Sequence, residues 1–188
     1  MRFADKLEAG RGRAGETAIA RWLIARGHSV LPVYEKIIED GKGPQLFSAS
    51  GGLVAPDLVA FKDGRVLWIE AKHKTAFTWW RIGQVFETGI DLRHYLDYLK
   101  VREKSGCPVF LLFLHKGGQA KDSPLSPDGL YGNDLSVLAA HESHRDPRWG
   151  RSGMVYWTRR VDGGPLVRLA GYEEVISSPA PLTPAGQP

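Results

Sequence analysis

Residues 56–72 read PDLVAFKDGRVLWIEAK, and this stretch decides the fold. The pair Asp63-Gly64 at its centre favours a two-residue turn, and β-branched, aromatic and aliphatic residues lie on both sides of it, as in the two strands of a hairpin. If these two residues form the turn, Asp57 lies directly opposite Glu70, with Cβ atoms roughly 5 Å apart. The sequence therefore predicts an antiparallel hairpin that ends in two facing carboxylates.

Lys72 adds a positive charge to this pair, because it comes two residues after Glu70 and so emerges on the same face of its strand. Like charges directly opposite one another are unfavourable, and a bound divalent cation would turn the two carboxylates into a ligand set. Two oxygen ligands, completed by waters and substrate phosphate, suit Mg²⁺. The alternative is that two exposed carboxylates and a lysine merely share the edge of a sheet.

The spacing of Pro56-Asp57 and Glu70-Ala71-Lys72 resembles the signature of the PD-(D/E)xK nuclease superfamily. The resemblance implies a restriction-endonuclease-like α/β fold, in which a mixed central sheet is flanked by helices. It also implies a phosphodiester hydrolase in which Asp57 and Glu70 bind Mg²⁺, with Mn²⁺ as a substitute. In that family the lysine, here Lys72, positions or activates the attacking water.

The first helix is expected from Ala14 to Arg26, with Gly27 as its C-terminal cap. Glu16 precedes apolar residues of this helix at spacings of three, four and seven, so it points toward the body of the protein. The segment 15–23 is similar to the opening helix of many PD-(D/E)xK nucleases, including archaeal-type Holliday junction resolvases. The resemblance implies that Glu16 completes the acidic, metal-binding site, whereas the alternative is a surface glutamate that stabilises the helix dipole.

Residues 35–55 follow a strand expected at 29–34 and are rich in glycine and charge without periodicity, which predicts a long loop. Ser50 lies in this loop, just before the acidic hairpin. Resolvase-like nucleases carry a serine-containing loop at about this place, so the resemblance implies that Ser50 contacts phosphate. A flexible turn is the alternative.

Basic and aromatic residues interleave after the acidic hairpin, where residues 73–81 read HKTAFTWWR. Lys74 and Arg81 are expected to pair with phosphates of DNA, and one of Trp79 and Trp80 to stack on bases or sugars. Core packing of both tryptophans beneath a loop is the alternative.

Asp91 is expected to cap a helix that runs through Ser105, with a core stripe of Leu92, Tyr95, Leu96 and Leu99. The corresponding helix of many PD-(D/E)xK proteins carries Gln-xxx-Tyr near the active site, and His94 stands where glutamine is usual. His94 is therefore expected to contact phosphate or to order the Lys72 region, unless it is a packing histidine. Lys100, on the same helix, is expected to meet the DNA backbone or solvent.

The remaining sequence predicts one domain over residues 13–176, between a flexible arm at 1–12 and a disordered Pro-rich tail at 177–188. Its further expected elements are a buried strand at 107–115 parallel to its neighbour, a surface excursion at 117–129, a short helix at 133–140, a basic loop at 144–151, and strands at 154–160 and 165–170. The run His141-Glu142-Ser143-His144 lacks further ligands at a spacing suited to zinc, so we reject a structural zinc site.

The net charge of +4 favours a polyanionic partner but fits a merely basic soluble protein equally well. The single Cys107 excludes an internal disulfide and fits a reducing cytoplasm. The longest strongly apolar run, residues 109–114, is far shorter than a membrane span, and the N-terminus lacks the apolar core of a signal peptide. We therefore expect a cytoplasmic protein without a membrane partner, at the bacterial nucleoid or in a phage-infected cell.

These patterns lead to the hypothesis of a Mg²⁺-dependent DNA endonuclease. Its substrate would be branched DNA, as for Holliday junction resolvases, or the DNA of another repair or phage-replication reaction. A non-catalytic nucleic-acid-binding module that retains the fold is the alternative. Cutting a four-way junction requires two symmetric cuts and hence a homodimer. Four residues are expected either to cover its interface or to complete the sheet of a monomer: Trp149, Met154, Tyr156 and Trp157.

Overall fold

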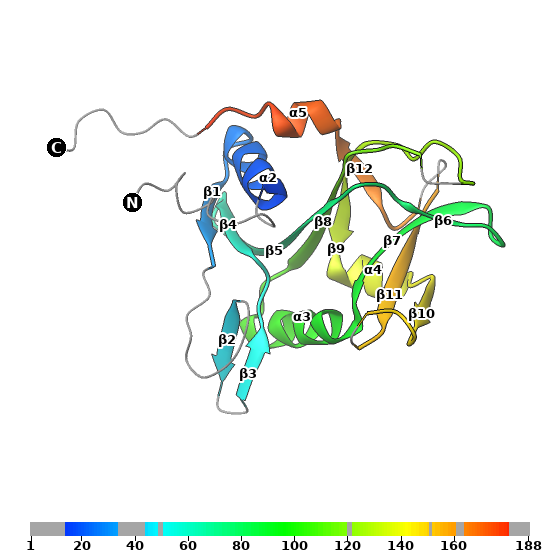
Figure 1. Ribbon diagram of the computed structural model, residues 1–188. Helices are drawn as coiled ribbons and strands as arrows, with labels where there is room; N and C mark the ends of the chain where they lie inside the picture. The colour runs from blue at the N-terminus through cyan, green and yellow to red at the C-terminus, as the bar shows by residue number, and fades with distance from the viewer. Residues whose placement is uncertain are drawn as a thin grey trace.

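The central feature of the fold is a six-stranded mixed sheet (Figure 1). The computed structural model describes residues 14–33, 44–48, 51–119, 122–150, 152–160 and 164–180. In spatial order the strands are β1 (Ser29–Pro32), β4 (Leu58–Lys62), β5 (Arg65–Lys74), β8 (Val109–His115), β9 (Gly129–Asp134) and β12 (Val167–Ala170). β5 and β8 run parallel, and the other neighbours are antiparallel.

The β4–β5 hairpin has the predicted turn and register. Lys62 faces Arg65 and Leu58 faces Ile69. The two turn residues, 63 and 64, have φ angles of 49° and 73°, as a type I′ turn requires, and glycine adopts such angles at no steric cost. The prediction of an antiparallel hairpin around Asp63-Gly64 is therefore confirmed.

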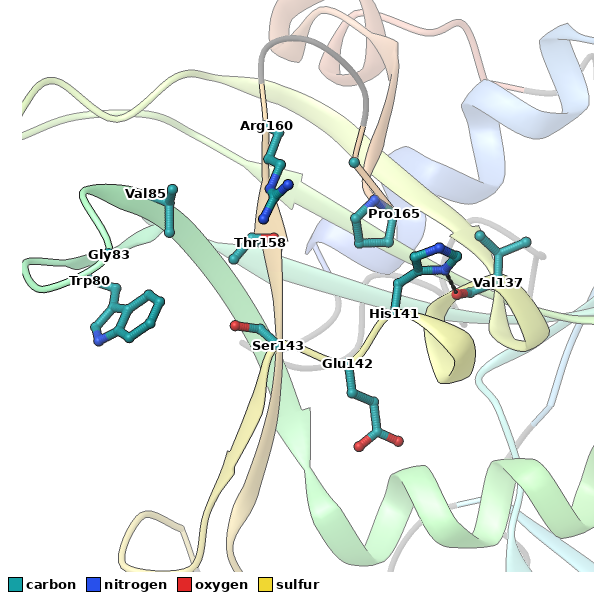
Figure 2. A pocket seen from close by; sticks show the side chains of 11 residues that line it. Trp80, Gly83, Val85, Val137, His141, Glu142, Ser143, Thr158, Arg160 and Pro165 are labelled. Atoms are coloured by element: carbon teal, nitrogen blue, oxygen red, sulfur yellow. Dashed lines mark hydrogen bonds between the residues drawn. The ribbon is translucent and has the colours of Figure 1, made fainter.

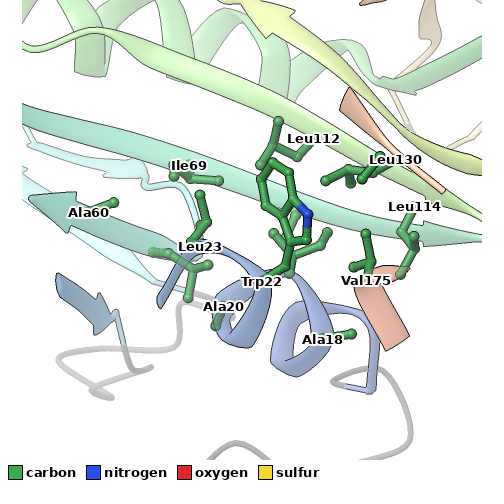
Figure 3. Close-up of a cluster of buried hydrophobic side chains, with 14 residues drawn as sticks. Ala18, Ala20, Trp22, Leu23, Ala60, Ile69, Leu112, Leu114, Leu130 and Val175 are labelled. Carbon is green, nitrogen blue, oxygen red and sulfur yellow. The ribbon is translucent and has the colours of Figure 1, made fainter. Parts of the chain in front are cut away.

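Helices cover both faces of the central sheet (Figure 1). On one face, α2 (Ala14–Ala25) and α5 (Tyr172–Ile176) enclose an apolar cluster with alternate strand residues such as Ile69 and Leu112 (Figure 3). On the other, α3 (Leu92–Ser105) and α4 (Leu135–Ala140) enclose a more aromatic cluster that includes Phe113 and Trp157. Neighbouring strand residues point to opposite faces, so one strand supplies both cores. The predicted α/β class with a mixed central sheet flanked by helices is confirmed.

A second, antiparallel sheet packs beside α3 and α4. Its strand order is β10 (His144–Asp146), β11 (Met154–Arg159), β7 (Val85–Asp91) and β6 (Thr78–Trp80). Trp157 on β11 is fully buried in the aromatic cluster, and its indole N–H donates to Leu138 O at 2.8 Å. By contrast, Trp149 is 64% exposed. Trp157, one of the four residues expected either at a dimer interface or in the sheet of a monomer, lies in the core of the single chain.

Three details of the predicted secondary structure are wrong. Residues 44–54 of the expected long loop contain a hairpin, β2 (Gln45–Ser48) and β3 (Gly51–Val54), whose pairing is not signalled by local periodicity. The expected basic loop begins with strand β10, which pairs with β11, the next strand in the chain. In the expected core stripe of α3, Tyr95 is buried and Leu92 and Leu99 pack against the aromatic cluster, but Leu96 is 41% exposed, and the helix buries Tyr98 and Val101 instead.

The error in α3 has a physical cause in the surface on which the helix packs. Tyr95 meets the Trp157 ring edge-to-face at 5.7 Å between centroids, a favourable geometry for aromatic pairs. The helix is therefore turned so that Tyr95 and Tyr98 are buried in the aromatic cluster and Leu96 faces outward. The ends of the helix are as predicted: Asp91 accepts from the Arg93 N–H at 2.9 Å, and Gly106 adopts a left-handed conformation.

The remaining expected elements are largely confirmed. α2 ends before Gly27, whose φ is +82°, and β8, α4, β11 and β12 fall within a few residues of their predicted positions. The predicted N-terminal arm and most of the predicted tail lie outside the described residues. Over the described ranges, no helix is both long and apolar enough to cross a membrane.

One buried titratable group lies at the end of β8. His115 is fully buried, and neither ring nitrogen has a hydrogen-bond partner among the described residues. Its ring stacks on Phe77 with centroids 3.6 Å apart. Burial, followed by the charge of Lys74, lowers the pKa of His115 from its usual 6.5 to about 3.

This depressed pKa predicts a specific loss of stability in acid. The unfolded chain takes up the proton near pH 6.5 and the folded chain only near pH 3, so His115 lowers the free energy of unfolding as pH falls between these values, by about 2 kcal/mol at pH 5. His115→Phe keeps an aromatic ring against Phe77 but removes the titration. Urea unfolding should show the stability advantage of the variant growing by that amount from pH 7.5 to pH 5. An advantage that is the same at both pH values would contradict a neutral, buried His115.

Candidate active site

The hairpin brings three predicted charged groups together at one end of β4 and β5. Asp57 immediately precedes β4, and its Oδ2 accepts a hydrogen bond from the Ala71 N–H at 3.0 Å. The Lys72 ammonium lies 3.9 Å from Asp57 Oδ2 and forms an ion pair with Glu70. The expected geometry of two facing acids with a lysine on the same face is therefore present.

The Glu70 carboxylate is the most buried member of this cluster. Its side chain is 1% exposed, and apart from the close contact with the Lys72 ammonium neither oxygen has a hydrogen-bond partner of normal geometry among the described residues. Side chains of Asp57 and Lys72 are 16% and 33% exposed, so the cluster opens to solvent past the lysine. A buried carboxylate without hydrogen bonds is costly unless a cation compensates it, and here only the Lys72 ammonium does so.

The crowding of the two acids changes their titration. Burial, reinforced by the charge of Glu70, raises the pKa of Asp57 to about 7, and Lys72 opposes this only in part. Burial alone would lower the pKa of Lys72, but Glu70 and Asp57 outweigh it and raise that pKa well above its usual range. At neutral pH Lys72 is therefore protonated, whereas Asp57 is close to its pKa and exchanges a proton with solvent.

α3 borders the cluster on the face of the sheet that carries Glu70 and Lys72. Tyr98 is buried, and its pKa is raised first by burial and then by the charges of Glu70 and Asp57. His94 lies one helical turn earlier, half-buried, with its ring centroid 6.2 Å from that of Tyr98. Burial lowers the pKa of His94, with a further contribution from Lys72, so this histidine is neutral at pH 7. Tyr98 stands at the tyrosine of the Gln-xxx-Tyr pattern, four residues after His94, but is not among the site residues predicted from the sequence.

Glu16 lies on the opposite side of the sheet from Tyr98. A Cβ added at Gly15 would overlap the His73 side chain, so the start of α2 packs closely on β5. His73 points away from the face that carries Glu70 and Lys72, in line with strand alternation. The charge of Glu16 nevertheless acts on Lys72, as the smallest of the contributions that raise its pKa. Among the described residues, no three His, Cys, Asp or Glu side chains are close enough to hold a metal by themselves.

The residues predicted to bind DNA are dispersed. Lys74 follows Lys72 on the same face of β5, and its pKa is lowered by burial and by that neighbouring cation. Arg81 lies in the turn after β6, 3.5 Å from Asp122, and Lys100 is exposed on α3, 3.9 Å from Asp97. Ser50 lies outside the described residues. Among the predicted DNA-binding residues that the structure describes, Lys74 and His94 therefore lie beside the acidic cluster, whereas Arg81 and Lys100 make their ion pairs elsewhere.

The two tryptophans of the basic-aromatic segment have different environments. Trp79 packs edge-to-face on Phe86 with centroids 4.8 Å apart, whereas Trp80 is 39% exposed. One tryptophan is thus available at the surface, as the sequence predicts.

The donor set fits a hard divalent cation. Glu70 offers two oxygens without hydrogen bonds, and the raised pKa of Asp57 reports a repulsion that a cation would relieve. Mg²⁺ is typically held by one or two carboxylates, with water and substrate phosphate as the other ligands. Asp57 and Glu70 are the residues that would hold it.

No family model matches this sequence, and no curated protein is similar to it in sequence. Among solved structures, the chain is similar to Hjc, a Holliday junction resolvase from the archaeal hyperthermophile Archaeoglobus fulgidus, with a TM-score of 0.44 and 12% sequence identity. The match covers 77% of this chain and 86% of that chain. No family membership follows from a similarity this distant.

The electrostatics of the metal-free site predict a stability gain on removing one charge. The folded chain binds the Asp57 proton near pH 7 and the unfolded chain near pH 3.8, so ionisation of Asp57 destabilises the fold as pH rises through this window. Asp57→Asn keeps an oxygen for the Ala71 N–H and should raise the free energy of unfolding at pH 8 by on the order of 2 kcal/mol. Denaturant unfolding in EDTA at pH 8 and pH 4 tests this; a gain of equal size at both pH values would exclude the predicted repulsion.

Proposed function

We propose that this protein is a metal-dependent DNA endonuclease that hydrolyses phosphodiester bonds. The observation that carries the proposal is the contact of two carboxylates, Asp57 and Glu70, with the Lys72 ammonium at one end of the β4–β5 hairpin. The resemblance of these positions to the PD-(D/E)xK signature supports the same reaction.

A bound Mg²⁺, or Mn²⁺ in its place, would polarise the phosphate and lower the pKa of a bound water. Asp57 and Glu70 would hold the cation, and the hydrogen bond from Ala71 fixes the carboxylate of Asp57. Glu16 acts from farther away, through its charge on Lys72, or contributes to a second metal position.

The protonation state of Lys72 assigns its role. Because its pKa is raised, Lys72 remains charged at neutral pH and does not serve as the base that removes a proton from water. Its ammonium instead donates to a phosphate oxygen or to the attacking water, where it stabilises the negative charge of the pentavalent transition state. The neutral imidazole of His94 and the hydroxyl of Tyr98 border this cluster and orient its members.

A non-catalytic DNA-binding module explains the cluster less well. Carboxylates repel the phosphate backbone, so a surface evolved for binding alone gains nothing from burying Glu70 without hydrogen bonds. Within the nuclease proposal, branched DNA is the substrate that we favour, with a homodimer supplying two symmetric active sites. The exposed Trp149 is a candidate for that interface.

Substitutions in the cluster should separate catalysis from folding. Asp57→Ala, Glu70→Ala and Lys72→Ala should each reduce Mg²⁺-dependent DNA cleavage by roughly 10²-fold or more. Binding of DNA in EDTA should persist and can tighten in the two acidic variants, since a negative charge is lost. Mg²⁺ should raise the melting temperature of the wild type but not of Asp57→Ala, which reports metal binding without relying on activity.

The cleavage assay should compare linear duplex, flap and four-way junction substrates, and light scattering should give the mass in solution. Full activity in Asp57→Ala or Glu70→Ala would refute the nuclease assignment. A strict monomer that cuts junctions and linear duplex equally would refute the preference for branched DNA and the homodimer, while leaving a general DNA nuclease.

The path of the DNA backbone can be tested through Lys74 and Arg81. Each phosphate contact contributes to the salt dependence of binding, so Lys74→Gln and Arg81→Gln should weaken affinity and reduce the slope of log K against log salt by about one each. Arg65→Gln makes the same charge change at the other end of β5 and serves as the control. Fluorescence anisotropy at several salt concentrations measures these slopes. Unchanged slopes in both variants would place the groove elsewhere, with residues 144–151 as the next choice.

A further inference from the structure

A pocket of about 670 Å³ lies on the second sheet, apart from the acidic cluster (Figure 2). Strands β6, β7 and β11 form one side of it, and the segment after α4 forms the other. Its volume is within the range of small-molecule sites. The side chains that matter for its chemistry are Trp80, His141, Glu142, Ser143, Thr158 and Arg160.

Trp80 provides an aromatic wall that is held in place. A Cβ added at Gly83 would overlap the six-membered ring of Trp80, so the turn packs directly on the indole. The ring of His144 lies 5.8 Å away between centroids and itself stacks on Tyr156 at 4.8 Å. Figure 2 shows the Trp80 ring at the rim of the pocket. The indole is therefore positioned to receive a flat ligand at low entropic cost.

Arg160 supplies the pocket with a group that can bind an anion. This residue is exposed just after β11, and no described carboxylate pairs with it. Glu142 also lines the pocket, but its two oxygens accept from Arg145 at 2.8 and 2.9 Å, and Tyr95 donates to it as well. The acidic charge is thus neutralised within the protein, while the guanidinium of Arg160 remains available to a ligand.

Two further groups offer hydrogen-bond acceptors. His141 Nδ1 lies 2.9 Å from Val137 O and must carry the hydrogen, because a carbonyl only accepts. In the neutral ring Nε2 is then an acceptor. Ser143 Oγ donates to the buried Glu87 at 2.7 Å and lies 3.3 Å from His144 Nδ1, which leaves one lone pair of the serine oxygen as an acceptor. The pocket thus offers an aromatic wall, a guanidinium and hydrogen-bond acceptors. A flat heterocycle that carries amino groups and an anionic substituent would complement all of them.

We propose that the pocket binds one nucleotide of the DNA substrate, with its base stacked on Trp80 and its phosphate at Arg160. The assignment of the ligand to a DNA strand rests on the proposed nuclease function. The shared chemistry, a base carrying a phosphate, is also that of a free mononucleotide, and the experiment below separates the two sources.

β7 connects this pocket to the acidic cluster. Val85 at the pocket is the first residue of β7, and Asp91 at the other end caps α3, which carries His94 and Tyr98. Seven strand residues span about 20 Å, which is less than the roughly 34 Å of one turn of duplex DNA. β7 is paired on both sides, with β6 and β11. A nucleotide held at Trp80 would therefore set the position of the same DNA molecule at Asp57 and Glu70.

The test measures the affinity of the full chain for a fluorescein-labelled single-stranded oligonucleotide and for a duplex with one unpaired nucleotide, in EDTA to prevent cleavage. Trp80→Ala and Arg160→Gln should each weaken binding about tenfold, and Trp80→Phe should weaken it much less because a stacking ring remains. Phe61→Ala and Arg65→Gln, which alter an exposed aromatic ring and an exposed arginine outside the pocket, are the matched controls. Circular dichroism confirms that each variant is folded.

Free dAMP is the second arm, followed through the NMR signal of the Trp80 indole N–H, which is identified by its loss in Trp80→Phe. Shifts that vanish in Arg160→Gln, together with the weakened oligonucleotide binding, support the pocket. Oligonucleotide affinities within twofold of the wild type in both Trp80→Ala and Arg160→Gln overturn the proposal, even if dAMP binds, because the pocket would then serve a free nucleotide. A wild type that cuts DNA while these variants bind normally leaves the nuclease function intact; a wild type that neither cuts nor binds DNA refutes the function itself.

Discussion

The hydrogen bond from the Ala71 N–H to the Asp57 carboxylate is the interaction on which the candidate site depends. The paired register of β4 and β5 ends at Leu58 and Ile69, and this side-chain hydrogen bond holds the Asp57 carboxylate just beyond that pair, close to Glu70. The turn at Asp63-Gly64 sets that register, and a slip of one residue would send Glu70 and Lys72 to the other face, beneath α2. A local backbone feature thus determines where the chemistry lies.

The close approach of the Asp57 and Glu70 carboxylates destabilises the folded state, and packing elsewhere in the fold holds the two groups together. Glu70 is buried without hydrogen bonds, and its charge helps to raise the pKa of Asp57 to about 7. Lys72 compensates these acids only partly, which leaves the cluster suited to a further cation. Such destabilised groups are typical of functional sites, because the surrounding structure holds them in place. Here the aromatic cluster around Tyr98 and Trp157 provides that support through α3.

The second sheet contributes buried residues to the core and also links the pocket at Trp80 to the acidic cluster. β7 belongs to this sheet and leads directly into the cap of α3, so the pocket at Trp80 and the acidic cluster are joined by one continuous strand and helix. A paired strand transmits position better than a loop, because its hydrogen bonds on both sides resist bending. Under the two proposals, the strand would keep the distance between a held nucleotide and the scissile phosphate constant.

The sequence by itself determined the hairpin, its register, the facing acids, the ends of α3 and the mixed α/β architecture. The hairpin, its register, the facing acids and the ends of α3 follow from turn geometry and capping within a few tens of residues, whereas the mixed architecture is implied by the resemblance of the motif to the PD-(D/E)xK signature. Only the tertiary structure decided that α3 buries Tyr98 rather than Leu96, that β2 pairs with β3, and that α2 places Glu16 across the sheet from Tyr98. It also decided that Trp80 and Arg160 share a pocket, although 80 positions separate them in sequence. These features depend on which surfaces meet when distant segments pack, and no local propensity encodes that choice.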